Sequence, residues 1–465
     1  MCSVIFNHCW QQTTAILPDM RNDYVAIING NIVKEGLSFH GDLLITDGRI
    51  IKIGSSIHTQ VGTKVIDAKG KYLFPGLIDD QVHFREPGLT HKGGILSESA
   101  AAVAGGVTSF MDMPNVKPAT TTRQLLAEKY TLAAGKAYAN YAFYLGASNT
   151  NIDEIKQLQT GETCGVKIFM GSSTGNLLVD DSQALEEIFA QCPVLIATHC
   201  EDNPTIERNL AEARQRYPEG NIPISEHPHI RSVEACYKSS SKAVALAKKH
   251  GSKLHVLHLT SKKELDLFSS GDPSNKNITA EVCVHHLYFD DSYYESMGSK
   301  IVCNPAIKTS TDRNALIDAV RTGSIDVIAT DHAPHTLEEK AKPYPDHPAG
   351  LPLIQHSLLV LLDFYLKGEL SLETIAEKTS HALANIYDIK DRGFIREGYW
   401  ADLVLVDFEK TTKVNSGNIL YDCGWSPFEG YEFNSLIDKT FVNGELIYTN
   451  GKLITKPSGL KIEFG

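Results

Sequence analysis

The sequence predicts an α/β fold, a (β/α)8 barrel with a small β-subdomain built from both chain ends. Three observations predict it. Eight short apolar runs alternate with helical patterns through the middle of the chain. Both ends are rich in β-type runs closed by Asn-Gly or Asp-Gly, which are hairpin signals. No glycine-rich phosphate-binding fingerprint opens a helix, which weakens the alternative of a nucleotide-binding doubly wound sheet.

The chain of 465 residues divides into three predicted parts. Residues 1–22 form an N-terminal extension, residues 23–75 and 391–465 form the composite β-subdomain, and residues 76–390 form the barrel. A rule of about 150 residues per domain gives roughly three units, although barrels often exceed it. The strands expected at the two ends include YVAIING, DLLITDG, ADLVLVDF, KTFVNGELIYTNGKLI and GLKIEFG.

Each apolar run of the middle part is expected to be one barrel strand. The eight runs are PGLIDDQVHF, GVTSFMDM, YANYAFYLGA, GVKIFM, PVLIATHC, KLHVLHLT, ITAEVCV and SIDVIAT. Helical patterns lie between them, for example SQALEEIFAQ, SVEACYKSSSKAVALAKKH and RNALIDAVRTG.

Composition and charge exclude several classes of protein. The formal net charge is −12, whereas a nucleic-acid binder or a protein that docks on anionic membranes needs a basic surface. No apolar stretch approaches the ~18 residues of a membrane span. The nine cysteines include no CxxC pair, which favours buried reduced thiols in a cytoplasmic protein.

Side chains that can bind a metal stand at the ends of five of the predicted strands. They are His83, Lys167, His199, His258 and Asp331. The carboxyl ends of barrel strands meet at one mouth, where active sites are built. Each residue alone has an ordinary explanation, such as a buried core histidine or a helix cap. Together they predict a metal site, and imidazole and carboxylate suit zinc.

Lys167 is the unusual member of this set, because an ammonium group would repel a cation. Burial lowers the pKa of a lysine and frees the neutral amine. A neutral amine can take up CO2 and become a carbamate, which is an anionic ligand able to bridge two metals.

The motifs of residues 25–455 resemble those of the amidohydrolase superfamily, and within it the dihydroorotases of the long type. The motifs are GLIDDQVHFREPG, MDMPN, GVKIFMGSSTG, THCED, HVLHLTS, EVCVHHL, CNPAIK, TDHAPH and SPFEG. The combination of HFREPG with DHAPH separates the chain from hydantoinase-like and allantoinase-like relatives.

The resemblance implies a role for each site residue. The metal ligands would be His83, Lys167 as a carbamate, His199, His258 and Asp331. The substrate carboxylate would be held by Arg85, Asn115 and His335, and the ring by Asn304. Hydroxide on one or two zinc ions would attack the ring carbonyl of dihydroorotate to give N-carbamoyl-L-aspartate, with Asp331 as general base and then acid. The reverse reaction belongs to pyrimidine biosynthesis.

Two positions depart from the family's pattern. Gln81 stands where the family has the first histidine of a His-x-His pair, and a glutamine carbonyl is a weaker zinc ligand than imidazole. Three arrangements follow: weak coordination by Gln81, a partly empty metal position, or a water in the gap. Lys308 of CNPAIK stands where the family commonly has an arginine, which leaves the ring contacts open.

Two other functional hypotheses compete with that of a dihydroorotase. One is hydrolysis of another cyclic amide, of the hydantoin or allantoin type, which Arg85 and His335 argue against because those substrates lack the carboxylate. The other is an inactive dihydroorotase-like partner of aspartate carbamoyltransferase, which Gln81 keeps open. A small molecule is the expected partner, and the resemblance also allows a homodimer.

Overall fold

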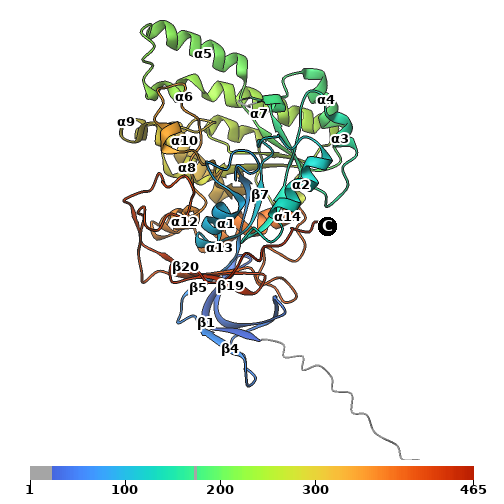
Figure 1. Ribbon diagram of the computed structural model, residues 1–465, viewed down its shortest axis with the longest axis vertical. Helices are drawn as coiled ribbons and strands as arrows, with labels where there is room; N and C mark the ends of the chain where they lie inside the picture. The colour runs from blue at the N-terminus through green and yellow to red at the C-terminus, as the bar shows by residue number, and fades with distance from the viewer. Residues whose placement is uncertain (1–23, 172–174) are drawn as a thin grey trace, which may run out of the picture.

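The computed structural model describes residues 24–171 and 175–465. The predicted extension, residues 1–22, lies outside the described residues. A barrel with helices around it occupies the upper and middle parts of the view in Figure 1. Strands from the two ends of the chain, blue and red in Figure 1, lie together below it.

Eight parallel strand segments form the barrel wall. Five of them, together with the short strand β9 (Leu145–Gly146), run in the order β14-β13-β12-β11-β10-β9, and three run in the order β6-β7-β8. A parallel bridge between Val82 and His332 brings the end of the last strand beside the first. The strands are β6 (Leu77–Val82), β7 (Val107–Asp112), β8 (Asn140–Phe143), β10 (Val166–Phe169), β11 (Ile196–His199), β12 (Leu254–Val256), β13 (Ile278–Cys283) and β14 (Val327–Ala329).

Helices cover the outside of the barrel, so its strands are buried on both faces, as every residue of β6 and β7 is. The helices are α1 (Ile95–Ala104), α2 (Arg123–Ala133), α3 (Ile152–Lys156), α4 (Ser182–Gln191), α5 (Asn203–Arg216), α6 (His227–Ile230), α7 (Val233–His250), α8 (Val284–Tyr288), α9 (Tyr293–Met297), α10 (Ser310–Thr322), α11 (Leu337–Lys340), α12 (Ser357–Leu366), α13 (Leu372–Ala376) and α14 (Ala382–Ile386). Local signals set their ends: the Ser232 side chain caps α7, and Gly251 ends it at a φ of 71°.

The second region is a sheet to which both chain ends contribute, called the composite sheet below. Its path is β20-β19-β18-β15-β5-β1-β2-β3, with β4 paired to β1. The two ends meet where β5 pairs antiparallel with β15, Leu73 opposite Leu405. The strands are β1 (Val25–Lys34), β2 (Leu37–Thr46), β3 (Arg49–Gly54), β4 (Lys64–Asp67), β5 (Tyr72–Pro75), β15 (Leu403–Asp407), β18 (Leu436–Val442), β19 (Glu445–Thr449) and β20 (Lys452–Leu453). A separate pair joins β16 (Thr412–Lys413) to β17 (Glu432–Phe433).

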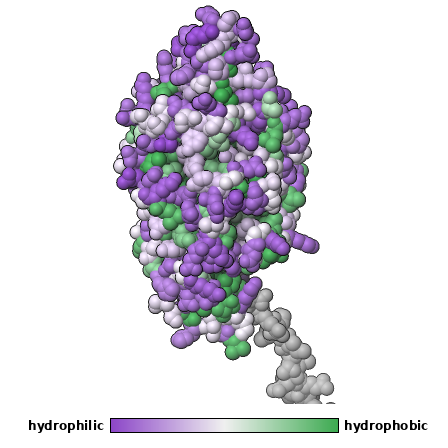
Figure 2. Space-filling model, turned by 90° about the vertical axis from the view of Figure 1, so that its left-hand side faces the viewer, coloured by the Kyte–Doolittle hydropathy of each residue, from purple (hydrophilic) through white to green (hydrophobic). Residues whose placement is uncertain are grey.

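The predicted fold class is confirmed, and one predicted strand lies elsewhere. The GLKIEFG segment was expected in the β-subdomain, but Lys461 bridges to Tyr141 of β8 and Phe464 bridges to Ile389. The exact domain boundaries stay a prediction. Among the residues that the structure describes, none of the helices combines the length and apolar character needed to cross a membrane. On the face seen in Figure 2, hydrophobic residues are scattered among hydrophilic ones.

Candidate active site

A cavity of about 410 Å³ lies at the carboxyl ends of the barrel strands, here called the barrel mouth. The structure brings all ten predicted site residues to its wall, although they come from distant parts of the chain. They are Gln81, His83, Arg85, Asn115, Lys167, His199, His258, Asn304, Asp331 and His335. Their individual roles stay predictions.

One half of the predicted metal centre is built by two histidines. His199 Nδ1 lies 3.0 Å from His258 Nε2, a spacing that suits two ligands of one ion. His199 Nε2 lies 3.1 Å from the Glu201 carboxylate and donates to it, so Nδ1 carries the lone pair that faces His258. Burial lowers the pKa of both imidazoles and keeps them neutral, which is the form that binds metals.

Glu201 is itself held by an ion pair with Arg231. Burial alone would raise the pKa of the Glu201 carboxyl, but Arg231 and the His199 contact hold it well below its usual range. The carboxylate that orients His199 is therefore ionised at neutral pH.

The other half of the predicted centre pairs His83 with Asp331. His83 Nε2 lies 3.0 Å from Asp331 Oδ1, and His83 Nδ1 lies 2.7 Å from Asn115 Oδ1. Gln81 lines the same cavity as His83. Its Oε1 faces the Cys283 thiol at 3.8 Å.

Lys167 lines the same cavity and is fully buried. Within the described residues its Nζ has no hydrogen-bond partner, and it sits 4.8 Å from the centre of the Phe169 ring. Burial lowers the pKa of Lys167 to about 8, which raises the fraction of neutral amine. A buried, unpartnered amine among neutral imidazoles and a carboxylate fits a carbamate and a bound metal ion.

Arg85 and His335 line the same cavity and form what is here called the clamp. Arg85 is 6% exposed, its Nε donates to the Pro334 carbonyl at 3.1 Å, and its Nη2 lies 3.0 Å from His335 Nε2. Burial lowers the pKa of Arg85 to about 10, so the guanidinium stays charged at neutral pH. Burial and the nearby Arg85 and Lys92 lower the pKa of His335, which is therefore neutral. Buried Asn304 has an Oδ1 without a partner among the described residues.

Three residues of the site have strained backbones. Arg85, His258 and Asp331 have φ values of 67°, 42° and 48°, in the left-handed region that favours glycine. Each such residue costs about 1–3 kcal/mol and persists only where its surroundings hold it firmly.

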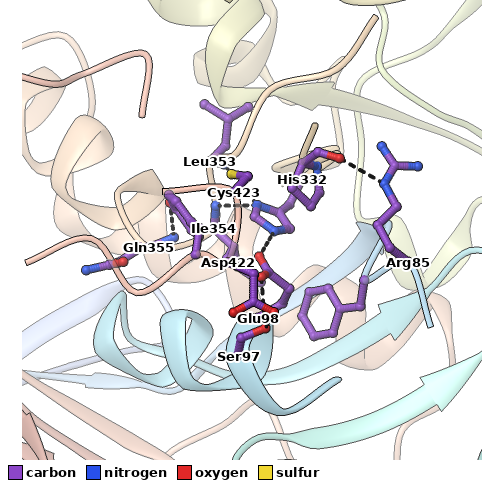
Figure 3. Close-up of polar contacts among 12 residues, drawn as sticks. Arg85, Ser97, Glu98, His332, Leu353, Ile354, Gln355, Asp422 and Cys423 are labelled. Carbon is purple, nitrogen blue, oxygen red and sulfur yellow. Dashed lines mark hydrogen bonds and ion pairs between the residues drawn. The ribbon is translucent and has the colours of Figure 1, made fainter. Parts of the chain in front are cut away.

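A buried histidine next to Asp331 supplies part of that support (Figure 3). His332 Nδ1 accepts from Leu353 N at 3.0 Å, so its Nε2 carries the proton and donates to Glu98 at 2.6 Å. Glu98 also accepts from the Asp422 backbone N–H at 3.1 Å. The imidazole faces away from the cavity, as predicted, and ties the Asp331 loop to α1 and to the segment around Asp422.

Two further buried groups contain residue types that bind metals. In the first, His255 Nε2 faces Asp80 at 3.2 Å and Glu281 at 3.5 Å. Burial lowers the pKa of His255, but contacts with the two carboxylates outweigh it and raise it to about 9, so the imidazolium is their counter-ion. The second group is Cys283, His285 and His286. Neither group includes a ligand predicted from the sequence.

Sequence reasoning missed two polar residues that complete the site. Lys92 lies in the loop after the first barrel strand, 3.1 Å from His335 Nδ1 and 2.8 Å from Glu339. Its position in the same loop as Arg85 was the available signal. Arg231 acts through Glu201 and has no signal in the motifs. Lys308 lies away from the cavity wall, with its Nζ donating to the Ala306 carbonyl at 3.1 Å.

Comparisons with known proteins agree with this architecture. The model of the amidohydrolase family matches residues 72–447. A dihydroorotase from Pyrococcus furiosus is 32% identical over 437 residues, covering 94% of this chain and 95% of the relative. A dihydroorotase from Methanosphaera stadtmanae is 31% identical over 386 residues, covering 82% and 87%. The structure of an L-hydantoinase (dihydropyrimidinase) from Arthrobacter aurescens has a TM-score of 0.89 at 25% identity, covering 95% of this chain and all of the other.

Proposed function

The chain belongs to the amidohydrolase family, and from that premise we propose that it is a dihydroorotase. It interconverts dihydroorotate and N-carbamoyl-L-aspartate. In pyrimidine biosynthesis the reaction runs in the direction of ring closure. The barrel, residues 76–390, carries the reaction, and the composite β-subdomain of residues 23–75 and 391–465 supports it.

The observation that carries the proposal is the clamp beside the metal ligands. Arg85 is buried, charged and 3.0 Å from His335, and Asn115 lines the same cavity. A guanidinium in such a place suits a planar carboxylate. Dihydroorotate and carbamoyl-aspartate carry that carboxylate, whereas hydantoin, dihydropyrimidine and allantoin do not.

The proposed metal is zinc, one or two ions per chain, held by His83, His199, His258, Asp331 and the carbamate of Lys167, with Gln81 as a doubtful ligand. When bound, the metal polarises the ring carbonyl and lowers the pKa of a water. Asp331 takes a proton from the attacking water and passes it to the ring nitrogen that leaves. Arg85, Asn115 and His335 hold the carboxylate, and Asn304 contacts the ring, so the carbonyl is fixed beside Asp331.

The test is turnover of dihydroorotate and of carbamoyl-aspartate by zinc-loaded protein, with dihydrouracil and hydantoin as control substrates. We expect turnover in both directions, lost on chelation and restored by zinc, and at least about 10²-fold weaker with the uncharged substrates. Turnover of hydantoin at an equal rate would replace this proposal with a hydantoinase. Absence of any turnover from folded, zinc-loaded protein would favour an inactive partner of aspartate carbamoyltransferase, to be sought by co-purification.

A further inference from the structure

We propose that the two halves of the metal centre hold their ions unequally. An ion at His199 and His258 stays bound through purification, whereas an ion at His83 and Asp331 exchanges readily. The inference rests on the metal binding of the proposed function but not on its substrate. We argue it from the hydrogen-bond partners of His199 and His83 and from the orientation of Gln81.

The His199 half has a charged supporting partner. His199 Nε2 donates to the Glu201 carboxylate at 3.1 Å, and Arg231 pairs with that carboxylate from its other side. An imidazole that donates to a carboxylate is a more basic and better oriented ligand, and loss of such a partner typically costs 10–100-fold in metal affinity. This half therefore offers two imidazoles, one of them strengthened, besides the bridging carbamate.

In the described structure the supporting partner of His83 is a neutral side chain. His83 Nδ1 lies 2.7 Å from the side-chain amide oxygen of Asn115, not from a carboxylate. The second imidazole that would complete this half is absent, because Gln81 occupies its position. Besides the same bridging carbamate, the half keeps one imidazole and the Asp331 carboxylate, 3.0 Å apart.

Gln81 does not replace that imidazole in the observed geometry. Its only acceptor atom, Oε1, faces the Cys283 thiol at 3.8 Å, and an amide nitrogen cannot bind a cation. The thiol also lies 3.6 Å from Glu281, so it is anchored on the barrel wall. Even if the amide turned, a neutral carbonyl oxygen suits zinc less well than imidazole does.

The first experiment counts retained zinc without any substrate. Protein loaded with zinc and bicarbonate is passed through a desalting column containing a weak chelator, and zinc per chain is measured by mass spectrometry. We expect one ion in the unchanged protein and two in Gln81→His, with Gln159→His at an exposed position as the matched control that stays at one. Two ions retained by the unchanged protein, none retained, or a Gln81→His count that stays at one would each overturn the proposal.

A second pair of variants assigns the retained ion to one half and does not depend on Gln81→His folding. His83→Asn is expected to keep one ion, whereas His258→Asn loses it, with circular dichroism verifying that both are folded. Cobalt titration of the unchanged protein followed by absorbance should give two binding phases whose Kd values differ by at least about tenfold. A single phase, or loss of the ion in His83→Asn with retention in His258→Asn, contradicts the assignment. Failure of dihydroorotate turnover with one ion held would reject the proposed function and leave this inference standing.

Discussion

Buried charged side chains of the composite β-subdomain pair with one another or, like Asp42, accept backbone hydrogen bonds, whereas those of the barrel mouth face a cavity. In that subdomain, residues 23–75 and 391–465, Arg392 is paired with Asp402, and Lys71 lies 2.7 Å from Asp438. At the barrel mouth the described structure offers no hydrogen-bond partner to Lys167 Nζ or His258 Nδ1. Among the described residues of 24–75 and 391–465, the unpartnered buried side-chain atoms are all hydroxyl oxygens.

Backbone strain divides the two regions in the same way. In residues 24–75 and 391–465, all the left-handed non-glycine residues except Asp391 directly precede a glycine, as Asn443 and Asn450 do in hairpin turns. At the barrel mouth the left-handed residues are Arg85, His258 and Asp331, and none of them precedes a glycine. The comparison teaches that polar groups left unsatisfied and strained mark the site, while satisfied ones stabilise the fold.

The largest effect should come from the clamp. Arg85→Ala is expected to lower kcat/KM for dihydroorotate by about 10³-fold, which is about 4 kcal/mol of transition-state stabilisation, because the substrate carboxylate loses its buried guanidinium partner. The free energy of unfolding should fall by only about 1 kcal/mol. Steady-state kinetics and urea unfolding measure both, with Arg85→Lys expected to restore charge but not the paired hydrogen bonds. If Arg85→Ala lowered the free energy of unfolding by as much as the activation free energy rises, the clamp would serve stability as much as activity, and the contrast between the two regions would not hold.

The opposite pattern is expected in the composite sheet. Asp402→Asn leaves buried Arg392 without its charge partner and should lower the free energy of unfolding by about 3 kcal/mol, roughly 10²-fold in the folding equilibrium. Turnover by the fraction that stays folded should change by less than about twofold. A large loss of kcat in folded protein would mean that this region acts on the site.

A substitution of Glu98 should affect both stability and activity. Glu98 is a buried carboxylate paired with His332, and through His332 it holds the strained Asp331 loop. Glu98→Gln should lower kcat by about 30-fold with KM nearly unchanged, and stability by about 2 kcal/mol. Asp402→Asn is the matched control, since its comparable loss of stability should leave kcat intact. A kcat equal to that of the unchanged enzyme would show that His332 does not position Asp331.

The smallest effect concerns how pH governs formation of the carbamate. With a pKa of about 8, Lys167 is about a tenth neutral at pH 7 and about nine-tenths neutral at pH 9. Only the neutral amine reacts with CO2, so reactivation of metal-free enzyme at fixed dissolved CO2 and metal should accelerate about tenfold per pH unit below 8 and level off above it. A reactivation rate still rising tenfold per unit beyond pH 9 would indicate an ordinary lysine.

Much of the fold could be predicted from the sequence, because barrel strands and helices carry local signals. All eight apolar runs became barrel strands, and SQALEEIFAQ became α4 at the predicted residues. The GLKIEFG segment was misplaced because alternation of apolar residues predicts a strand but not its neighbour, and here the neighbour is Tyr141 of β8.

The sequence predicts the site residues that stand at the ends of barrel strands. It does not predict the residues that support them through a second side chain. The ten predicted residues converge because the carboxyl ends of barrel strands share one mouth. Arg231 and Glu98 were not predictable as support, since each lies on or beside a helix and reaches the site through one further side chain. Such pairings depend on helix packing, which no local pattern encodes.

The pairing of β5 with β15 has a consequence for how the protein is made. β15 leaves the ribosome about 330 residues after β5, which at ~5–20 residues per second is a wait of roughly 15 to 70 s. During that time the edge of β5, the strand that directly precedes the first barrel strand, has no partner on its β15 side. The newborn chain therefore carries an open sheet edge for most of its synthesis, a period in which chaperones have an exposed strand to bind.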